Sequence, residues 1–297
     1  MYRFLDAIIR GIQTGSIYGL VGLGINVIFG ATSVFNFAQG DMVMVGGMLG
    51  VSLWIATGLP FGLALLVVMA VAALMGGATE MVAVRGTARF RHSTVLWIIS
   101  TLGVSIIIEA VTTLLAVRHN SDNGTRAFPD YVPWHAITIG KLLIIPQRAI
   151  LFPIALGVTA LVWLCFRYTF WGRGLSAMAF DREGAAMRGL PVGRLAVLAF
   201  AIGGTLAGFG GFVAGPITQA SVTLGFGITL KGFIAATIGG IPELWGPLLG
   251  GVILGVAEQL TTVYWDASFT NLVALGLLLV VLMVRPNGII GRQVRTL

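Results

Sequence analysis

The sequence predicts an all-α integral membrane protein, a polytopic bundle of eight or nine spanning helices that includes one broken or re-entrant helix. The 297 residues are 57% hydrophobic and 10% charged, whereas soluble domains carry about 25% charged residues. Several apolar runs approach the ~20 residues that a helix needs to cross a bilayer. Basic residues gather in short segments between these runs, as they do in cytoplasmic loops. This bias explains the net charge of +7, so the charge does not indicate a nucleic-acid partner.

The first half of the chain is expected to hold five spans. The first covers about residues 11–30, and Gly11, Gly15 and Gly19 repeat on one of its faces, a spacing that lets another helix approach closely. We interpret it as a retained segment, because no convincing signal-peptide cleavage site follows it. The other four are expected at about residues 42–57, 61–84, 94–117 and 149–168.

The loops of this half differ in character. A polar turn with Asn36, Gln39 and Asp41 separates the first two spans. Residues 85–92 include three arginines, which is a strong cytoplasmic signal. Residues 118–141 are polar, aromatic and rich in turn residues, as an external loop would be, and their role is not predicted.

The second half is expected to hold three full spans and one short helix. The sixth span follows Arg194 and is expected to end at Pro216, so that Thr218 and Gln219 lie in a non-helical connection. Residues 228–238 are too few to span alone and predict the broken or re-entrant helix. The last two spans are expected at about 246–264 and 268–284, followed by a basic, cytoplasmic C-terminus. The side of the N-terminus depends on whether eight or nine spans cross, and stays open.

A charged segment interrupts the apolar chain between Arg167 and Arg194, where seven charged residues fall within 28 positions. Asp181 is suited to cap a short helix, and Gly189 followed by Pro191 supplies its end. If the helix begins earlier, Leu175, Met178 and Ala186 share one face. The segment is either an ordinary solvated cytoplasmic loop or a docking element for another protein.

No pattern in the chain indicates catalysis, a metal or a bound nucleotide. Neither a P-loop nor a dinucleotide-binding glycine pattern occurs. The three histidines, His92, His119 and His135, lack metal-ligand spacing, and no Ser or Cys nucleophile has a recognisable base. Cys165 is the only cysteine, so no internal disulfide is possible. We therefore predict a protein that is not an enzyme and carries no cofactor.

Three stretches resemble one known family. GSIYGLVGLGINVIFGATSVFNFAQGDMVMVGG is similar to the N-terminal signature of branched-chain amino-acid ABC transporter permeases of the LivH/LivM type, and the LivH partner is the closer match. IGGIPELWGPLLGGVILGVAEQL, followed by VRPNGIIG, resembles the end of the same permeases, and RGLSAMAFDREGAAMRGLPVGRL resembles their cytoplasmic loop. The matches lie in the family's order and span nearly the whole chain. They imply the ABC importer permease fold and one transmembrane permease domain over residues 1–297.

The resemblance also implies partners and a role for the charged segment. The chain would be an inner-membrane subunit that pairs with a second homologous permease, two ABC ATPase subunits and a periplasmic substrate-binding protein, with membrane lipid around it. Residues 172–194 would form the cytoplasmic coupling loop, seated in a groove of an ATPase that hydrolyses the ATP. Within that loop the residues expected to contact the ATPase are Asp181, Glu183, Ala186, Arg188 and Gly189.

A zwitterionic substrate needs a lined path, and polar groups at membrane depth are costly enough to suggest function. The candidates for this path are Asn26, Asn36, Gln39, Asp41, Thr218, Gln219 and Lys231, with Glu109 and Glu258 as outer candidates. Each has a simpler interpretation as a helix cap or an interhelical hydrogen bond. Branched-chain amino acids are the default substrate, but other amino acids, amides or urea remain open, as does a homodimeric pairing.

Two other classes of protein remain as alternatives. A self-contained secondary transporter or channel would use ionisable residues near the midplane, and Glu109, Lys231 and Glu258 are available for that role. That class leaves the charged segment unexplained. A membrane enzyme acting on lipid would need paired acids or histidines at one interface, and no such pair is evident.

Overall fold

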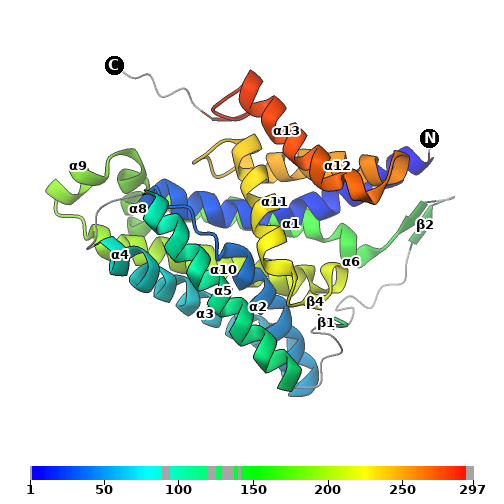
Figure 1. Ribbon diagram of the computed structural model, residues 1–297, viewed down its shortest axis with the longest axis horizontal. Helices are drawn as coiled ribbons and strands as arrows, with labels where there is room; N and C mark the ends of the chain where they lie inside the picture. The colour runs from blue at the N-terminus through cyan, green and yellow to red at the C-terminus, as the bar shows by residue number, and fades with distance from the viewer. Residues whose placement is uncertain (1, 89–93, 119–124, 129–136, 140–141, 292–297) are drawn as a thin grey trace. The chain divides into compact units, whose positions relative to one another are not determined.

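The computed structural model describes residues 2–88, 94–118, 125–128, 137–139 and 142–291 (Figure 1). Helices make up nearly all of this part of the chain. Its strands have two or three residues each: β1 (Thr125–Arg126), β2 (Ile137–Ile139), β3 (Leu142–Ile144) and β4 (Ala220–Ser221). β1 pairs with β4 and β2 with β3, both antiparallel. The predicted all-α class is confirmed.

Seven helices of the described residues are long and apolar enough to cross a membrane. Two more apolar segments are shorter. They are α2 (Gln39–Val51), which continues as a π-helical turn (Ser52–Ala56), and α11 (Leu224–Gly239). Together these segments correspond one by one to the eight runs and the short helix expected from the sequence. The spanning helices are α1 (Tyr2–Thr32), α3 with its π-helical continuation (Phe61–Thr79 and Glu80–Arg85), α5 (Thr94–Arg118), α6 with α7 (Pro146–Ala149 and Leu151–Tyr168), α10 (Val192–Thr218), α12 (Gly246–Tyr264) and α13 (Thr270–Val284).

Two helices extend beyond their predicted spans. α1 begins at Tyr2, before the span expected at about 11–30, and an ion pair between Arg10 and Asp6, at 2.9 Å, lies in its polar first turns. α10 continues through Pro216 and ends at Thr218, whose hydroxyl donates to the Ala214 carbonyl. A proline so close to a helix end removes one hydrogen bond without preventing the last residues from being helical.

The chain divides into two compact units. One comprises Met1–Asn26, Val132–Trp163 and Leu230–Leu297, and the other comprises Val27–Tyr131 and Leu164–Thr229. Three of the four boundaries fall inside α1, α7 and α11, and the fourth lies outside the described residues. The two units are called unit 1 and unit 2 in that order. That the whole chain acts as one permease domain stays a prediction.

In unit 1, α1 and α12 approach through glycines. A Cβ atom at Gly15 would collide with the backbone of Gly251, and one at Gly255 would collide with the backbone of Gly11. The two backbones therefore touch directly, which only residues without a side chain allow. The close approach predicted from the four-residue glycine spacing of α1 is confirmed.

The C-terminal segment closes the end of α11. The amides of Ile289 and Ile290 donate to the carbonyls of Ile238 and Gly239, at 2.9 and 3.0 Å. Gly240 and Gly288 make this possible, since both have positive φ, +113° and +77°, and their backbones touch. The PNGIIG motif thus supplies hydrogen-bond donors to carbonyls that the helix end leaves unpaired.

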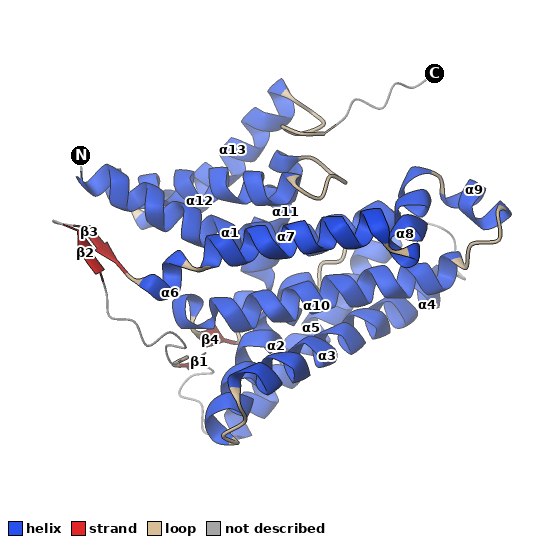
Figure 2. Cartoon of the chain, turned by 180° about the vertical axis from the view of Figure 1, so that it is seen from behind, coloured by secondary structure: helices blue, strands red, loops and turns tan. Residues whose placement is uncertain are grey.

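In unit 2, α10 packs against α2 and α3 (Figure 2). Small residues again form the contact, because a Cβ atom at Gly204 would meet the Ala72 backbone and one at Gly211 would meet the Val43 carbonyl. Phe200 and Phe212 of α10 are fully buried. The core of this unit therefore lies along α10.

Candidate functional site: the charged segment and the buried polar groups

The charged segment folds into two short helices separated by Asp181. α8 (Phe170–Phe180) ends and α9 (Arg182–Met187) begins at this residue, whose backbone is extended at φ −153°. The Asp181 carboxylate accepts a hydrogen bond from the Gly184 amide at 3.0 Å, which caps α9. Gly189, with φ +81°, follows the end of α9. The predicted cap and stop are confirmed.

A helix that continued from α8 into α9 would have given Leu175, Met178 and Ala186 a common face. That interpretation is wrong, because the chain turns at Asp181. Leu175 and Met178 are buried in α8 against Leu195 and Ala199 of α10, whereas Ala186 is exposed in α9. α8 thus anchors the segment to unit 2, and α9 projects from it.

α9 and its flanks present a mostly exposed surface. The five residues predicted to contact an ATPase are all exposed: Asp181, Glu183, Ala186, Arg188 and Gly189. Phe180 and Met187 are also exposed, at 95% and 84%, and sequence reasoning missed them. Two large apolar side chains within a charged segment were the available signal. Such side chains flanked by charges are typical of a protein interface.

Polar contacts connect the charged segment to the ends of longer helices within unit 2. Arg182 donates to the Thr32 carbonyl at the end of α1, at 3.3 Å, and interacts electrostatically with buried Glu80. Glu80 pairs with Arg85 at 2.9 Å, and Arg85 donates to the Gly193 carbonyl at the start of α10. A movement of α9 would therefore bear on α1, α3 and α10. These links join residues far apart in the sequence, so spacing could not have predicted them.

Four path candidates in unit 2 serve visible structural roles or lie at a helix end. Asn36 accepts a hydrogen bond from the Ala38 amide at 3.1 Å and donates to Gln39 at 3.4 Å. Gln39 donates to the Gly203 carbonyl of α10 at 2.8 Å. Both are buried, whereas Gln219 is exposed just after Thr218 ends α10.

Asp41 differs from these candidates. Its side chain is buried, and neither carboxylate oxygen has a hydrogen-bond partner among the described residues. One oxygen occupies the space that a Cβ atom at Gly225 would need. Ser105 and Glu109 of α5 both interact electrostatically with the Asp41 carboxylate, although Ser105 makes no aligned hydrogen bond with it. Glu109, an outer candidate, is itself exposed.

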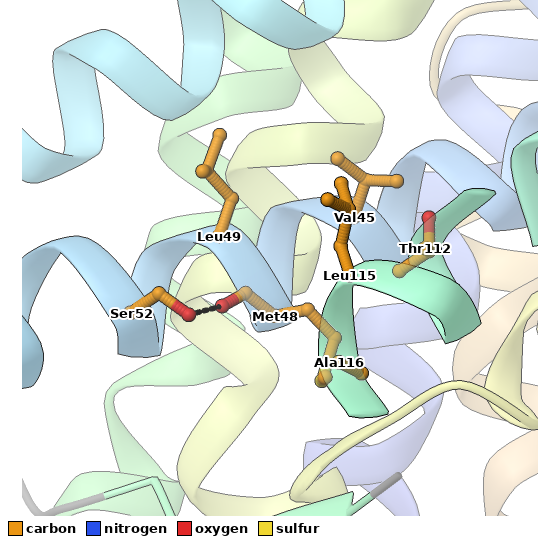
Figure 3. Close-up of a pocket in the computed structure, with 7 residues that line it drawn as sticks. All are labelled: Val45, Met48, Leu49, Ser52, Thr112, Leu115 and Ala116. Carbon is orange, nitrogen blue, oxygen red and sulfur yellow. Dashed lines mark hydrogen bonds between the residues drawn. The ribbon is translucent and has the colours of Figure 1, made fainter. Parts of the chain in front are cut away.

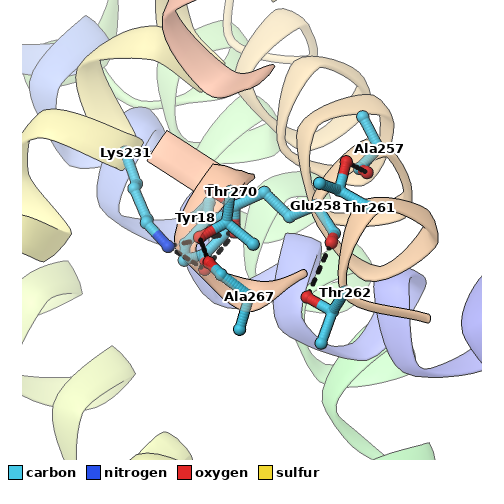
Figure 4. Close-up of polar contacts among 8 residues, drawn as sticks. All are labelled: Tyr18, Lys231, Ala257, Glu258, Thr261, Thr262, Ala267 and Thr270. Atoms are coloured by element: carbon cyan, nitrogen blue, oxygen red, sulfur yellow. Dashed lines mark hydrogen bonds and ion pairs between the residues drawn. The ribbon is translucent and has the colours of Figure 1, made fainter. Parts of the chain in front are cut away.

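Unit 1 holds the remaining candidates. Asn26 donates to the carbonyls of Gly240 and Glu243, at 3.1 and 2.7 Å, and so holds the connection between α11 and α12. Lys231 lies 3.0 Å from Glu258 and 3.1 Å from the Tyr18 hydroxyl, which itself donates to Glu258 at 2.9 Å (Figure 4). Three helices thus meet at one largely buried charged cluster. Lys231 and Glu258 were predicted as separate candidates, and Tyr18 was missed because only the fold brings it there.

A pocket of about 260 Å³ lies in unit 2 between α2 and α5 (Figure 3). Its lining is mostly apolar: Val45, Met48, Leu49, Ser52, Thr112, Leu115 and Ala116. The hydroxyls of Ser52 and Thr112 donate to carbonyls of their own helices, at 2.8 and 2.7 Å. The pocket wall therefore offers few free polar groups.

Within the described residues, no three His, Cys, Asp or Glu side chains gather closely enough to hold a metal ion. The three histidines lie outside the described residues.

Residues 7–282 match the model of one family, described as "Branched-chain amino acid transport system / permease component". The chain belongs to this family. It is 28% identical to the high-affinity branched-chain amino acid transport system permease protein LivH of Escherichia coli K12, covering 97% of this chain and 96% of that protein. BraD of Pseudomonas aeruginosa, with the same description, is 29% identical over 98% of this chain and 97% of its own length.

More distant similarities extend over the same length. The ribose import permease protein RbsC of Haemophilus influenzae is 22% identical over 95% of this chain and 85% of its own length. The solved structure of PsaBC from Streptococcus pneumoniae in complex with Fab has a TM-score of 0.51 at 16% identity, covering 97% of this chain and 93% of that one. This permease therefore has the fold of that structure, and the predicted family is confirmed.

Proposed function

We propose that this permease works in an ATP-driven ABC importer and lines, together with a second homologous permease, the membrane path for branched-chain amino acids. Two ABC ATPase subunits would supply the energy from the cytoplasm, and a periplasmic binding protein would deliver the substrate. The family match over residues 7–282 is the single observation that carries this proposal. The full-length similarity to LivH and BraD favours branched-chain amino acids over the sugar of the more distant ribose permease.

The coupling element in this proposal is α9 with its flanks. Its exposed apolar side chains, Phe180 and Met187, would fill pockets of an ATPase, and the exposed charges of Glu183 and Arg188 would set its register. The contacts of Arg182, Glu80 and Arg85 would transmit its movement to α1, α3 and α10. Transport makes and breaks no covalent bond, so this role requires no catalytic residue.

The localisation that fits this role is the bacterial inner membrane, with α9 and the C-terminus in the cytoplasm. Arg285 and the arginines after it, like those of the charged segment, follow the positive-inside bias.

Co-purification tests the assembly. The tagged chain, extracted from its native membrane in gentle detergent, is expected to carry a second permease and two ATPase subunits, identified by mass spectrometry. Recovery of the chain alone as a stable homo-oligomer, with uptake in liposomes driven by an ion gradient and no ATPase, would contradict the proposal. The buried Lys231–Glu258 pair would then favour a secondary transporter.

A variant of α9 tests the coupling role. In the purified complex, Met187→Asp is expected to lower ATP hydrolysis stimulated by the loaded binding protein at least about tenfold, because an interface anchor is worth ~1.4 kcal/mol or more. Trp265→Ala is the matched control, since Trp265 is also a large exposed side chain, at 76%, but lies in the connection between α12 and α13. Equal stimulation in the Met187 variant and the control would place the ATPase contact elsewhere.

A further inference from the structure

We propose that the facing sides of α2 and α5 form a subsite for the transported amino acid, in which Asp41 accepts its ammonium group and the adjoining pocket takes its aliphatic side chain. This subsite rests on the proposed function, which supplies an amino acid as the ligand. It lies entirely within unit 2.

Asp41 is a buried carboxylate that lacks hydrogen-bond donors within the described part of the chain. A buried carboxylate without hydrogen-bond donors is costly, and native proteins rarely keep one without a partner. Asp41 is 1% exposed, and both of its oxygens lack a partner among the described residues. Its position in the first turn of α2 favours a negative charge there but leaves those two oxygens without donors. An ammonium group, with three donors, would satisfy them.

Asp41 lies on the same face of α2 as the residues that line the pocket. Residues 41, 45, 48 and 52 recur at the spacing of one helix face, and the last three line the pocket. On α5 the same spacing aligns residues 105, 109, 112 and 116. The first two interact electrostatically with Asp41, and the last two line the pocket. Figure 3 shows Val45 and Thr112 at one end of the pocket and Ser52 at the other. Asp41 and Glu109 therefore lie one helical turn before Val45 and Thr112, at that end of the pocket.

An apolar pocket beside two acidic residues suits a ligand with a hydrocarbon side chain and an ammonium group. The pocket is far larger than the roughly 30 Å³ that one water occupies, and its largely apolar lining favours a hydrocarbon group over water. Glu109 adds a second negative charge beside Asp41, which favours a cation. No Lys or Arg occurs in residues 39–56 or 94–117. The inference therefore covers the ammonium and the side chain, and assigns no partner to the α-carboxylate.

Cysteine protection tests the subsite directly. In the complete complex in lipid nanodiscs, Cys165→Ser removes the native thiol and Thr112→Cys places one in the pocket. Its modification by 2-aminoethyl methanethiosulfonate is followed by mass spectrometry of this chain. L-leucine is expected to slow the reaction about tenfold at about ten times its Kd, as competition for one site requires. 3-Methylbutylamine, which keeps the ammonium and the branched chain, is expected to protect, and 3-methylbutanoate is not.

Two further variants sharpen the test. Asp41→Asn is expected to abolish protection by leucine, measured as the ratio of its own labelling rates without and with leucine. Asp266→Asn, which neutralises an exposed acid of the α12–α13 connection, is the matched control and is expected to retain protection. If Asp41→Asn does not fold, the comparison of the amine with the carboxylate in the unaltered site decides the question.

Several results would overturn the subsite. They are protection by 3-methylbutanoate equal to that by the amine, full protection in Asp41→Asn, no protection by leucine, or no labelling at all, since a pocket that admits leucine must admit a reagent of similar size. The assay needs neither ATP nor the binding protein. Its failure is therefore distinct from failure of the importer proposal, which would show as absent ATP-driven uptake.

Discussion

Two groups of buried polar residues in this permease have different physical roles. Asn26 and Gln39 donate to backbone carbonyls of neighbouring segments, which fixes a loop in one case and a helix contact in the other. Lys231 and Glu258 instead bring opposite charges together in a largely buried place, with side-chain exposures of 26% and 4%. A neutral hydrogen bond stabilises the fold modestly, whereas a buried charge depends on its partner.

Replacing one member of the Lys231–Glu258 pair is expected to destabilise the fold more than replacing both members. Lys231→Met or Glu258→Leu alone leaves one charge without its partner and is expected to lower the free energy of unfolding by about 3–5 kcal/mol. The double variant Lys231→Met/Glu258→Leu leaves no unpaired charge and is expected to be more stable than either single variant. Thermal unfolding of the four proteins in detergent measures the coupling.

A second readout separates stability from transport in these variants. If the double variant recovers stability and also ATP-driven uptake, the pair is structural. If it recovers stability alone, the charges act in transport. Additive losses, with no coupling between the two positions, would show that the contact contributes nothing.

Local chemistry made some residues of the charged segment predictable. Asp181 and Gly189 were identified because a cap and a left-handed turn depend on neighbours in the sequence. Phe180, Met187 and Tyr18 were not, because their importance depends on exposure or on residues from other helices. Asp41 was identified by its type, but its lack of a partner is visible only in the structure.

At the scale of elements, helix contacts in unit 1 depend on missing side chains. α1 and α12 touch through Gly11, Gly15, Gly251 and Gly255, so the backbones themselves form the interface. In a membrane, apolar side chains gain little by leaving lipid for another helix, and close packing carries the association. The contact is therefore sensitive to any added volume.

Gly15→Leu is expected to prevent this contact. The added side chain would meet the Gly251 backbone, which cannot yield as a flexible side chain can. Loss of the folded protein is the expected result, seen as aggregation in size-exclusion chromatography. Gly276→Leu in α13 is the matched control, because nothing lies within 4 Å of its Cβ position, and it should elute like the wild type. Equal profiles would mean that α1 and α12 are not held together here.

The apolar runs of the sequence predicted where the helices lie, but they predicted the helix ends less well. α2 has 13 residues before its π-helical turn, so its length differs from the single span expected at 42–57. α10 passes Pro216 because a proline in the last turn forfeits few hydrogen bonds. Such ends depend on small differences in hydrogen bonding that hydropathy does not record.

At the scale of the whole molecule, α11 decides how the chain crosses the membrane. It begins next to β4, which pairs with β1 in the loop predicted to be external. It ends where the C-terminal segment, predicted to be cytoplasmic, supplies hydrogen bonds. Its 16 residues extend about 24 Å, somewhat less than the ~30 Å hydrocarbon core. We therefore expect α11 to cross, which makes the crossings from α9 to the C-terminus even in number.

Cysteine labelling tests this topology. In Cys165→Ser, an impermeant maleimide applied to intact spheroplasts is expected to label Ala127→Cys, and to label Glu183→Cys and Arg285→Cys only after permeabilisation. The reason is that arginine-rich segments stay in the cytoplasm. Labelling of Arg285→Cys from outside, with Glu183→Cys still protected, would show α11 to be re-entrant. Lysed membranes, in which all three should react, provide the control.

The class, the family and the order of segments were readable from composition and motifs because each depends on the sequence alone. The pairing of α1 with α12 was not, since glycine spacing marks a close contact without naming the partner. The cluster of Tyr18, Lys231 and Glu258 was hidden for the same reason.

The bond between the C-terminal segment and α11 also sets an order of biogenesis. Ile289 and Ile290 leave the ribosome after the whole of α12 and α13, yet they complete the hydrogen bonding at the end of α11. Until synthesis of the following hairpin is over, the C-terminal segment cannot donate to the carbonyls at that helix end. A chain that stops before Ile289 would leave the end of α11 permanently unfinished.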